Sequence, residues 1–234
     1  MNQNPKSKIQ NPRSLWLVRH GQSTANIARQ KAEREDSPTI DYTGREMDIP
    51  LSEIGFEQSV RLGRWFRSRS PKPTVIFTSP YLRTAESSRL IAENAGLEDI
   101  EIIHDERIRE RELGIFDRLT WRGSVEKYPE ECAKRTEIGK FYYRPPGGES
   151  WCDVALRVRN FWRDLCLDHQ EEHILIVTHE VVVRIFRYVV EKMTEQEILA
   201  IDAASDVENG AVTGYEFDAK RNKFTLELDN YLPE

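Results

Sequence analysis

Two apolar runs that each end in a histidine constrain the fold of this chain most. Residues 14–18 lead into Arg19-His20-Gly21, and residues 173–178 lead into His179. Buried strands of this kind belong to a sheet that helices cover on both faces. Ligands of such open α/β sheets bind beyond the carboxyl ends of the strands. The sequence therefore predicts a site at these strand ends that holds a guanidinium group and two imidazoles.

The residue types at these strand ends suit phosphate chemistry. A guanidinium such as that of Arg19 matches the oxygens of a phosphoryl group, and a neutral imidazole can attack phosphorus. A third apolar run, 74–78, leads into Ser79-Pro80, which predicts Ser79 as an N-cap and Pro80 as the first helical residue. Arg83 would then lie near a helix N-terminus, where anions are attracted. The residues alone also allow a surface loop with ordinary arginines.

Strands alternate with helices along the chain. Because the chain has 234 residues, of which 38% are hydrophobic, it can bury the core of a single domain over 14–234. We expect an α/β fold, a three-layer α/β/α sandwich with a mostly parallel central sheet and a lid insertion. The expected strands are 14–18, 74–78, 100–104 and 173–178, with a hairpin of 211–217 and 222–229 at a sheet edge. The expected helices are 53–69, 80–95, 150–168, 180–191 and 195–200.

Three segments fit this sheet poorly. Residues 1–13 are polar and are expected to be a disordered lead-in. Residues 27–47 are charged and are expected to form either a helix and loop near the mouth of the site or a partly disordered loop. Residues 115–149 hold six aromatic residues and are expected to form the lid. The ten basic and ten acidic residues of 105–149 do not require a substrate that is strongly anionic beyond its phosphate.

Composition argues against several classes of partner. The net charge of −6 disfavours a nucleic-acid partner, and no apolar run is long enough for a membrane. The three cysteines, Cys132, Cys152 and Cys166, have neither metal-ligand spacing nor a paired framework, which is typical of reduced thiols in a cytoplasmic protein. We expect no metal and no cofactor. The oligomeric state cannot be inferred from the sequence.

Six motifs occur in the order found in one family. The chain resembles the histidine phosphatase superfamily, also called phosphoglycerate mutase-like, over about residues 14–217. The matching segments are Arg19-His20-Gly21-Gln22-Ser23 with Asn26, 48–55 with Gln58, 79–86, 109–114, 146–150 and Val177-Thr178-His179.

The resemblance implies a role for each site residue. Arg19, Arg83 and a protonated His179 would bind the phosphoryl oxygens of a small phosphomonoester. His20 would attack phosphorus, which requires a neutral ring whose other nitrogen donates a hydrogen bond. Glu110 would protonate the leaving oxygen and then activate water.

Three assignments near these residues are less direct. Glu112 is a rival for the acid, but Glu110 has the spacing that the family's carboxylate keeps from the following glycine. Ser23 and Asn26 would either reach the phosphate or cap a helix. Glu180 stands where the family usually has glycine, and it would raise the pKa of His179.

The resemblance leaves three functions open. We favour hydrolysis of a phosphomonoester through a phosphohistidine on His20. The basic Arg-Arg segment with which the family's mutases hold the substrate carboxylate cannot be aligned to 118–146, so a phosphoglycerate mutase is the alternative. A phosphate-binding or scaffold protein on the same fold is the third possibility, which the presence of His20, His179 and Glu110 disfavours.

Overall fold

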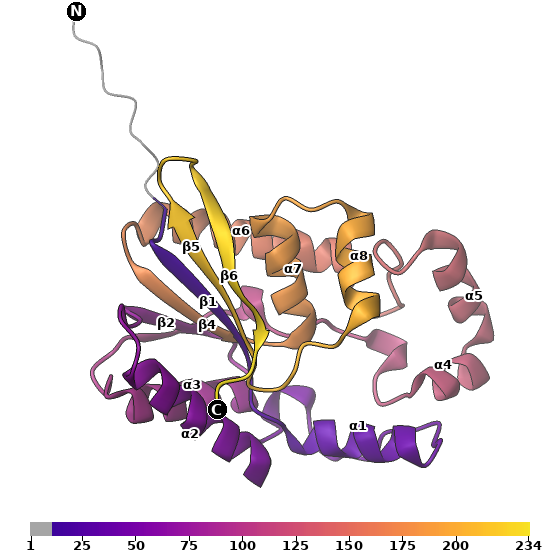
Figure 1. Cartoon of the computed structure of the whole chain (residues 1–234). Helices are drawn as coiled ribbons and strands as arrows, with labels where there is room; N and C mark the ends of the chain where they lie inside the picture. The colour runs from indigo at the N-terminus through magenta and orange to yellow at the C-terminus, as the bar shows by residue number, and fades with distance from the viewer. Residues whose placement is uncertain (1–10) are drawn as a thin grey trace, which may run out of the picture.

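A six-stranded sheet with helices on both faces forms the centre of the protein (Figure 1). In this computed structural model, residues 11–234 are described. The strand order is β3-β2-β4-β1-β5-β6. The first four strands are parallel, β5 pairs antiparallel with β1, and β6 pairs antiparallel with β5. The strands are β1 (Ser14–Arg19), β2 (Val75–Thr78), β3 (Ile102–His104), β4 (His173–Thr178), β5 (Val212–Asp218) and β6 (Lys223–Tyr231).

The α/β fold and its mostly parallel sheet are confirmed, and the final hairpin lies at the sheet edge as predicted. The helices also occur where expected, and α8 extends four residues beyond the predicted end at residue 200. The helices are α1 (Thr24–Arg34), α2 (Glu53–Arg67), α3 (Leu82–Ala95), α4 (Trp121–Lys127), α5 (Pro129–Ile138), α6 (Trp151–Asp168), α7 (Glu180–Val190) and α8 (Glu195–Ala204). Short 3-10 turns are η1 (Glu46–Asp48), η2 (Glu106–Ile108) and η3 (Gly114–Phe116).

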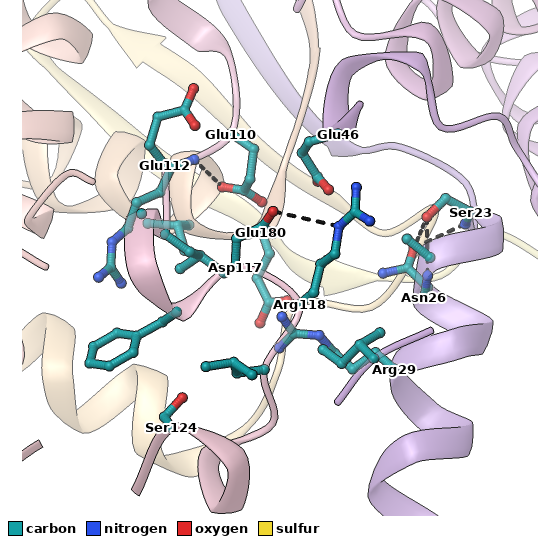
Figure 2. A pocket seen from close by; sticks show the side chains of 18 of the residues that line it. Ser23, Asn26, Arg29, Glu46, Glu110, Glu112, Asp117, Arg118, Ser124 and Glu180 are labelled. Carbon is teal, nitrogen blue, oxygen red and sulfur yellow. Dashed lines mark hydrogen bonds and ion pairs between the residues drawn. The ribbon is translucent and has the colours of Figure 1, made fainter. Parts of the chain in front are cut away.

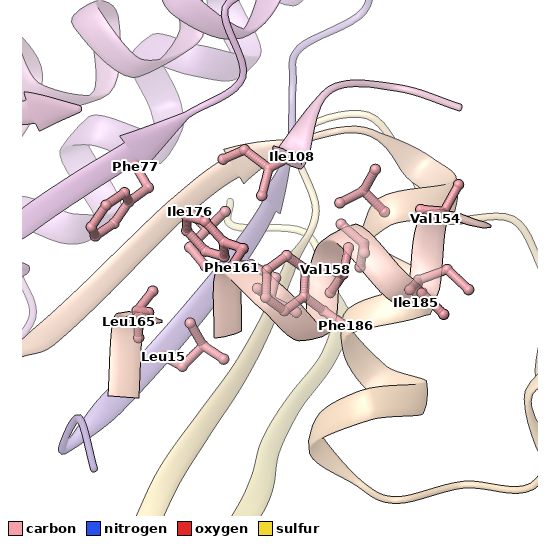
Figure 3. Close-up of a cluster of buried hydrophobic side chains, with 14 of the residues drawn as sticks. Leu15, Phe77, Ile108, Val154, Val158, Phe161, Leu165, Ile176, Ile185 and Phe186 are labelled. Carbon is pink, nitrogen blue, oxygen red and sulfur yellow. The ribbon is translucent and has the colours of Figure 1, made fainter. Parts of the chain in front are cut away.

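Alternate side chains of each buried strand enter two separate cores. Leu15 and Leu17 of β1 pack with α6, α7 and α8 (Figure 3), whereas Trp16 and Val18 pack with α2 and α3. The period of two along a strand sends neighbouring side chains to opposite faces, so a continuous apolar run requires a helix layer on each side. This division produces the three layers and leaves the strand ends open for a site.

One helix start differs from its prediction. Helix α3 begins at Leu82 with Tyr81 as N-cap, so Ser79 is not the N-cap and Pro80 is not the first helical residue. The hydroxyl of Ser79 instead lies 2.9 Å from Nε2 of His179 and accepts a hydrogen bond from the backbone of Tyr81. The side chain that was expected to cap the helix is therefore part of the strand-end cluster.

The two irregular segments lie against each other, away from the sheet (Figure 1). The segment 27–47 forms the end of α1 and a loop, which is the helix-and-loop alternative. Thr39 bridges to Leu119, and the backbone of Thr120 donates to Pro38. Of the predicted lead-in, residues 1–10 lie outside the described residues, while Arg13 donates from its backbone to Glu172. No helix within 11–234 has the length and hydropathy needed to cross a membrane.

Close backbone packing holds the loop that follows β1. Gly21 and Gln22 lie directly against Gly55 at the start of α2, and a Cβ on Gly55 would overlap the carbonyl of Gln22. The backbone of Ser52 also donates to Gln22 at 2.8 Å. The position of His20 therefore depends on the absence of a side chain at residue 55.

Replacing Gly55 with alanine is expected to lower the free energy of unfolding by about 1–3 kcal/mol, because the added methyl group forces two backbone segments apart. Urea denaturation would measure the loss. Glu57→Ala, on the exposed side of the same helix, is the control and should change stability by less than about 0.5 kcal/mol. A Gly55→Ala protein as stable as this control would show that the contact is loose.

Candidate active site

The ends of three neighbouring strands bring together residues that are far apart in the sequence. Strand β4 lies between β1 and β2, with Arg19 opposite Thr178 and Thr78 opposite Val177. The residues that follow these strands therefore meet at one edge of the sheet. His20 and His179 have ring centroids 5.1 Å apart, and Arg83 reaches them from the first turn of α3.

His20 is held with one ring nitrogen bonded to the backbone. Its Nδ1 lies 2.7 Å from the carbonyl oxygen of Gly21, as predicted, and its Nε2 lies 3.2 Å from Nε of Arg83. A hydrogen bond from Nδ1–H to the carbonyl leaves Nε2 as the acceptor of the arginine proton. Burial, followed by the charges of Arg83 and Arg19, lowers the pKa of His20 well below 6.5. The ring is therefore neutral, and the electron pair of its unprotonated Nε2 accepts the hydrogen bond from Arg83.

His179 is fully buried behind His20. Its Nε2 lies 2.9 Å from Oγ of Ser79, whereas its Nδ1 has no hydrogen-bond partner. Burial and the charge of Arg83 lower its pKa well below the usual 6.5. Desolvation and the neighbouring cations therefore both favour a neutral His179, and its protonation beside a phosphoryl group stays a prediction.

The two arginines of the cluster are paired with carboxylates. Both terminal nitrogens of Arg83 donate to Glu46, one to its backbone carbonyl and one to Oε1, each at 2.8 Å. Arg19 approaches Oε2 of Glu180 at 3.2 Å and donates to the carbonyl of Val207. Nε of Arg19 is buried without a partner. The positive charge at the strand ends is therefore already balanced by carboxylates of the chain.

Glu180 lies beside the arginines and not beside His179 as the sequence suggested. Its two carboxylate oxygens lie 3.2 Å from Arg19 and 3.7 Å from the buried Arg184. The predicted rise in the pKa of His179 is wrong, because burial, followed by the charge of Arg83, lowers this pKa well below 6.5. Glu180 therefore lies against Arg19 and Arg184 at the strand ends and does not turn toward solvent.

Glu110 and its rival Glu112 differ in their surroundings. Oε1 of Glu110 accepts from the backbone of Arg111 at 2.8 Å, and desolvation raises the pKa of its carboxyl, with a further contribution from the charge of Glu180. The side chain of Glu112 is 48% exposed and faces Arg109 at 3.6 Å. A raised pKa is what a proton donor near neutral pH requires, so the surroundings favour Glu110.

Ser23 and Asn26 form a capping box at the start of α1. The backbone of Asn26 donates to Oγ of Ser23 at 3.2 Å, and the backbone of Ser23 donates to Oδ1 of Asn26 at 2.9 Å. Asn209 donates to Oδ1 of Asn26 and, at 3.1 Å, to the backbone carbonyl of His20. The capping interpretation is thus confirmed, while contact with a phosphate stays a prediction.

Most of these side chains line a cavity of about 590 Å³ (Figure 2), whereas His179 and Ser79 lie outside its lining. The segment 27–47 contributes Arg29, Ile40, Tyr42 and Glu46 to its wall, and the segment 115–149 contributes Phe116, Trp121 and Arg135. Sequence reasoning missed Glu46, because it lies in a charged loop without a recognisable pattern. Only the fold shows that this loop returns to Arg83.

Charges in the cavity wall are balanced in number. Seven basic and seven acidic residues line it. The basic residues are Arg19, Arg29, Arg83, Arg111, Arg118, Arg135 and Lys140. The acidic residues are Glu46, Glu110, Glu112, Asp117, Glu180, Asp202 and Asp206. Within residues 11–234, no group of three or more His, Cys, Asp or Glu side chains is arranged to hold a metal ion.

Comparison with known proteins identifies the family. A model described as the histidine phosphatase superfamily (branch 1) matches residues 15–230. The chain belongs to this superfamily. The chain is 32% identical to a 2,3-bisphosphoglycerate-dependent phosphoglycerate mutase of Parvibaculum lavamentivorans, over 93% of this chain and 96% of the mutase. It is also 32% identical to the fructose-2,6-bisphosphatase TIGAR of Xenopus tropicalis, over 65% of this chain and 50% of that protein.

Solved structures of this superfamily share the fold. An Escherichia coli structure described as a putative alpha-ribazole-5'-P phosphatase has a TM-score of 0.74 and 22% identity, covering 94% of this chain and 97% of that one. A mycobacterial glucosyl-3-phosphoglycerate phosphatase has a TM-score of 0.71 and 22% identity, covering 95% and 100%. The predicted family is therefore confirmed, and its members include both mutases and phosphatases.

Replacing Glu180 with glycine is expected to tighten the binding of inorganic phosphate by about five- to tenfold, because the competing carboxylate on Arg19 is removed. Isothermal titration calorimetry would measure the change. The helix start should lose about 0.3–1 kcal/mol of stability, since α7 no longer has an acidic residue in its first turn. An unchanged phosphate affinity would mean that Glu180 does not compete with phosphate for Arg19.

Proposed function

We propose that this protein is a phosphomonoester hydrolase that works through a phosphohistidine on His20. The observation that carries the proposal is the unprotonated Nε2 of a neutral His20, which faces Arg83 while Nδ1 contacts the carbonyl of Gly21. This is the arrangement of an activated nitrogen nucleophile in a site that can hold a phosphoryl group.

In the first step, the phosphoryl oxygens of the substrate replace Glu46 on Arg83 and Glu180 on Arg19. His179 donates a further hydrogen bond, and the dianion raises the pKa of its ring toward protonation. Nε2 of His20 attacks phosphorus in line, and the bond from phosphorus to the ester oxygen breaks. Arg19 and Arg83 stabilise the charge that builds on the phosphoryl oxygens.

Glu110 supplies and then removes a proton. Its raised pKa favours the protonated carboxyl, which would protonate the departing alkoxide oxygen. The resulting carboxylate then takes a proton from a water that attacks phosphorus and releases His20. Each cycle returns the enzyme to its starting state, with one alcohol and one inorganic phosphate as products.

The charge balance of the cavity favours a hydrolase over a mutase. A mutase that depends on a bisphosphate must hold a strongly anionic ligand, which calls for a clear excess of basic residues. The wall of this cavity has equal numbers of basic and acidic residues. The similarity to a phosphoglycerate mutase, which covers 93% of this chain, supports phosphoglycerate mutase as the second candidate.

The covalent intermediate tests the mechanism. Brief mixing with a labelled phosphomonoester and an alkaline quench should leave label on the protein that is stable to base and lost in acid. His20→Ala should remove the label, because alanine lacks the ring nitrogen that would carry the phosphoryl group. Label that survives in His20→Ala would contradict the assignment. With 3-phosphoglycerate, release of phosphate supports the hydrolase, whereas isomerisation that depends on 2,3-bisphosphoglycerate supports the mutase.

The acid can be tested by the leaving group. Glu110→Gln keeps the shape but removes the proton, so turnover of an alkyl phosphate should fall by about 10²–10⁴-fold. The loss of turnover on p-nitrophenyl phosphate should be much smaller, because nitrophenolate leaves without a proton. Glu112→Gln is the matched control and should have a mild effect on both substrates. Equal losses on the two substrates would show that Glu110 is not the acid.

A further inference from the structure

Carboxylates of the chain occupy the anion-binding groups of both phosphoryl-site arginines. Glu46 approaches Arg83 at 2.8 Å, and Glu180 approaches Arg19 at 3.2 Å. Glu46 comes from a loop and Glu180 from the start of α7, so the two pairs arise from unrelated parts of the chain. Together they fill the positions that phosphoryl oxygens would take.

Each of these carboxylates has a second partner that keeps it near the site. The hydroxyl of Tyr42 donates to Oε2 of Glu46 at 2.9 Å. Arg184, only 2% exposed, lies 3.7 Å from Oε1 of Glu180. A phosphoryl group can therefore displace both carboxylates from the arginines without moving them out of the cavity.

The resulting charge count is unfavourable for a purely anionic substrate. The charges of Arg19 and Arg83 are cancelled by those of Glu46 and Glu180, and Glu110 is neutral when it acts as an acid. A bound phosphoryl dianion would thus face two nearby carboxylates without two uncompensated cations. An ammonium group on the alcohol of the substrate would lie among these carboxylates and restore the balance.

We propose that Glu46 and Glu180 are specificity-determining residues that select phosphomonoesters whose alcohol carries an ammonium group close to the ester oxygen. This inference rests on the proposed hydrolase activity and specifies its substrate class. The substrate is zwitterionic: its phosphoryl group binds the two arginines, and its ammonium group binds the two displaced carboxylates.

A pair of matched substrates tests this selection. O-phosphoethanolamine and ethyl phosphate share the ester and the two-carbon chain but differ in the ammonium group. We expect kcat/KM to be about tenfold higher or more for O-phosphoethanolamine, as close charge pairs in a partly enclosed site imply. Glu46→Gln and Glu180→Gln should each lower this ratio and improve hydrolysis of ethyl phosphate. Thermal melts would confirm that the variants are folded.

Glu112→Gln is the control, because Glu112 lines the same cavity but faces Arg109 instead of the phosphoryl-site arginines. This variant should keep the preference of the unaltered protein. Equal kcat/KM values for the two substrates, or a preference that both variants retain, would overturn the inference. Hydrolysis of p-nitrophenyl phosphate separates the two proposals. If the protein hydrolyses it but shows no preference for the ammonium-bearing ester, only the substrate class is refuted. If the protein hydrolyses neither p-nitrophenyl phosphate nor the two test esters, the hydrolase itself is refuted.

Discussion

The parallel pairing of β4 with β1 and β2 is the constraint on which the site depends. It places Arg19 next to Thr178 and Thr78 next to Val177, so the residues after three strands meet at one edge of the sheet. The pairing is maintained by apolar side chains that enter both cores, because shifting a strand by one residue would exchange its two faces. The same burial that fixes the register also desolvates the two histidines, which lowers their pKa values. Packing and chemistry therefore have a common origin in this protein.

Loops and helix starts then convert this edge into an enclosed site. The close backbone contact between Gly21 and Gly55 holds the turn that carries His20, and Asn209 donates to the carbonyl of that same residue. On the open side, the hydroxyl of Tyr42 lies within hydrogen-bond distance of both Glu46 and Asp117 and can donate its one proton to either, which joins the loop after α1 to the segment 115–149. The cavity is thus formed between a rigid sheet edge and two segments that contact each other. Variation in those two segments can change the substrate without altering the strands that carry the phosphoryl chemistry.

Patterns that are local in the sequence were predicted well, whereas contacts formed by the fold were not. The strands that end at His20 and His179 follow from runs of neighbouring apolar residues, and the structure has them as expected. Ser79 was assigned to a helix cap because its sequence context is that of an N-cap, but its hydroxyl is at His179 instead. Glu46 could not be assigned at all, since nothing in a charged loop indicates which arginine it will meet. Its role depends on a contact between residues 46 and 83 that exists only in the folded chain.

Buried arginines explain why carboxylates are found in an anion site. A guanidinium that is almost fully buried, as in Arg83, is costly unless a partner compensates its charge. When no phosphoryl group is bound, Glu46 and Glu180 supply that compensation, so the strand ends can keep their arginines in place without a ligand. The same carboxylates would compete with an anion for the two arginines, which would weaken the binding of free phosphate. For the proposed hydrolase, this competition acts on the product as well as on the substrate. The cation that a zwitterionic substrate brings is lost with its alcohol in the first step, and the phosphate left after hydrolysis faces both carboxylates alone. In the proposed hydrolase, the carboxylates that compensate the buried arginines would therefore also favour release of the final product.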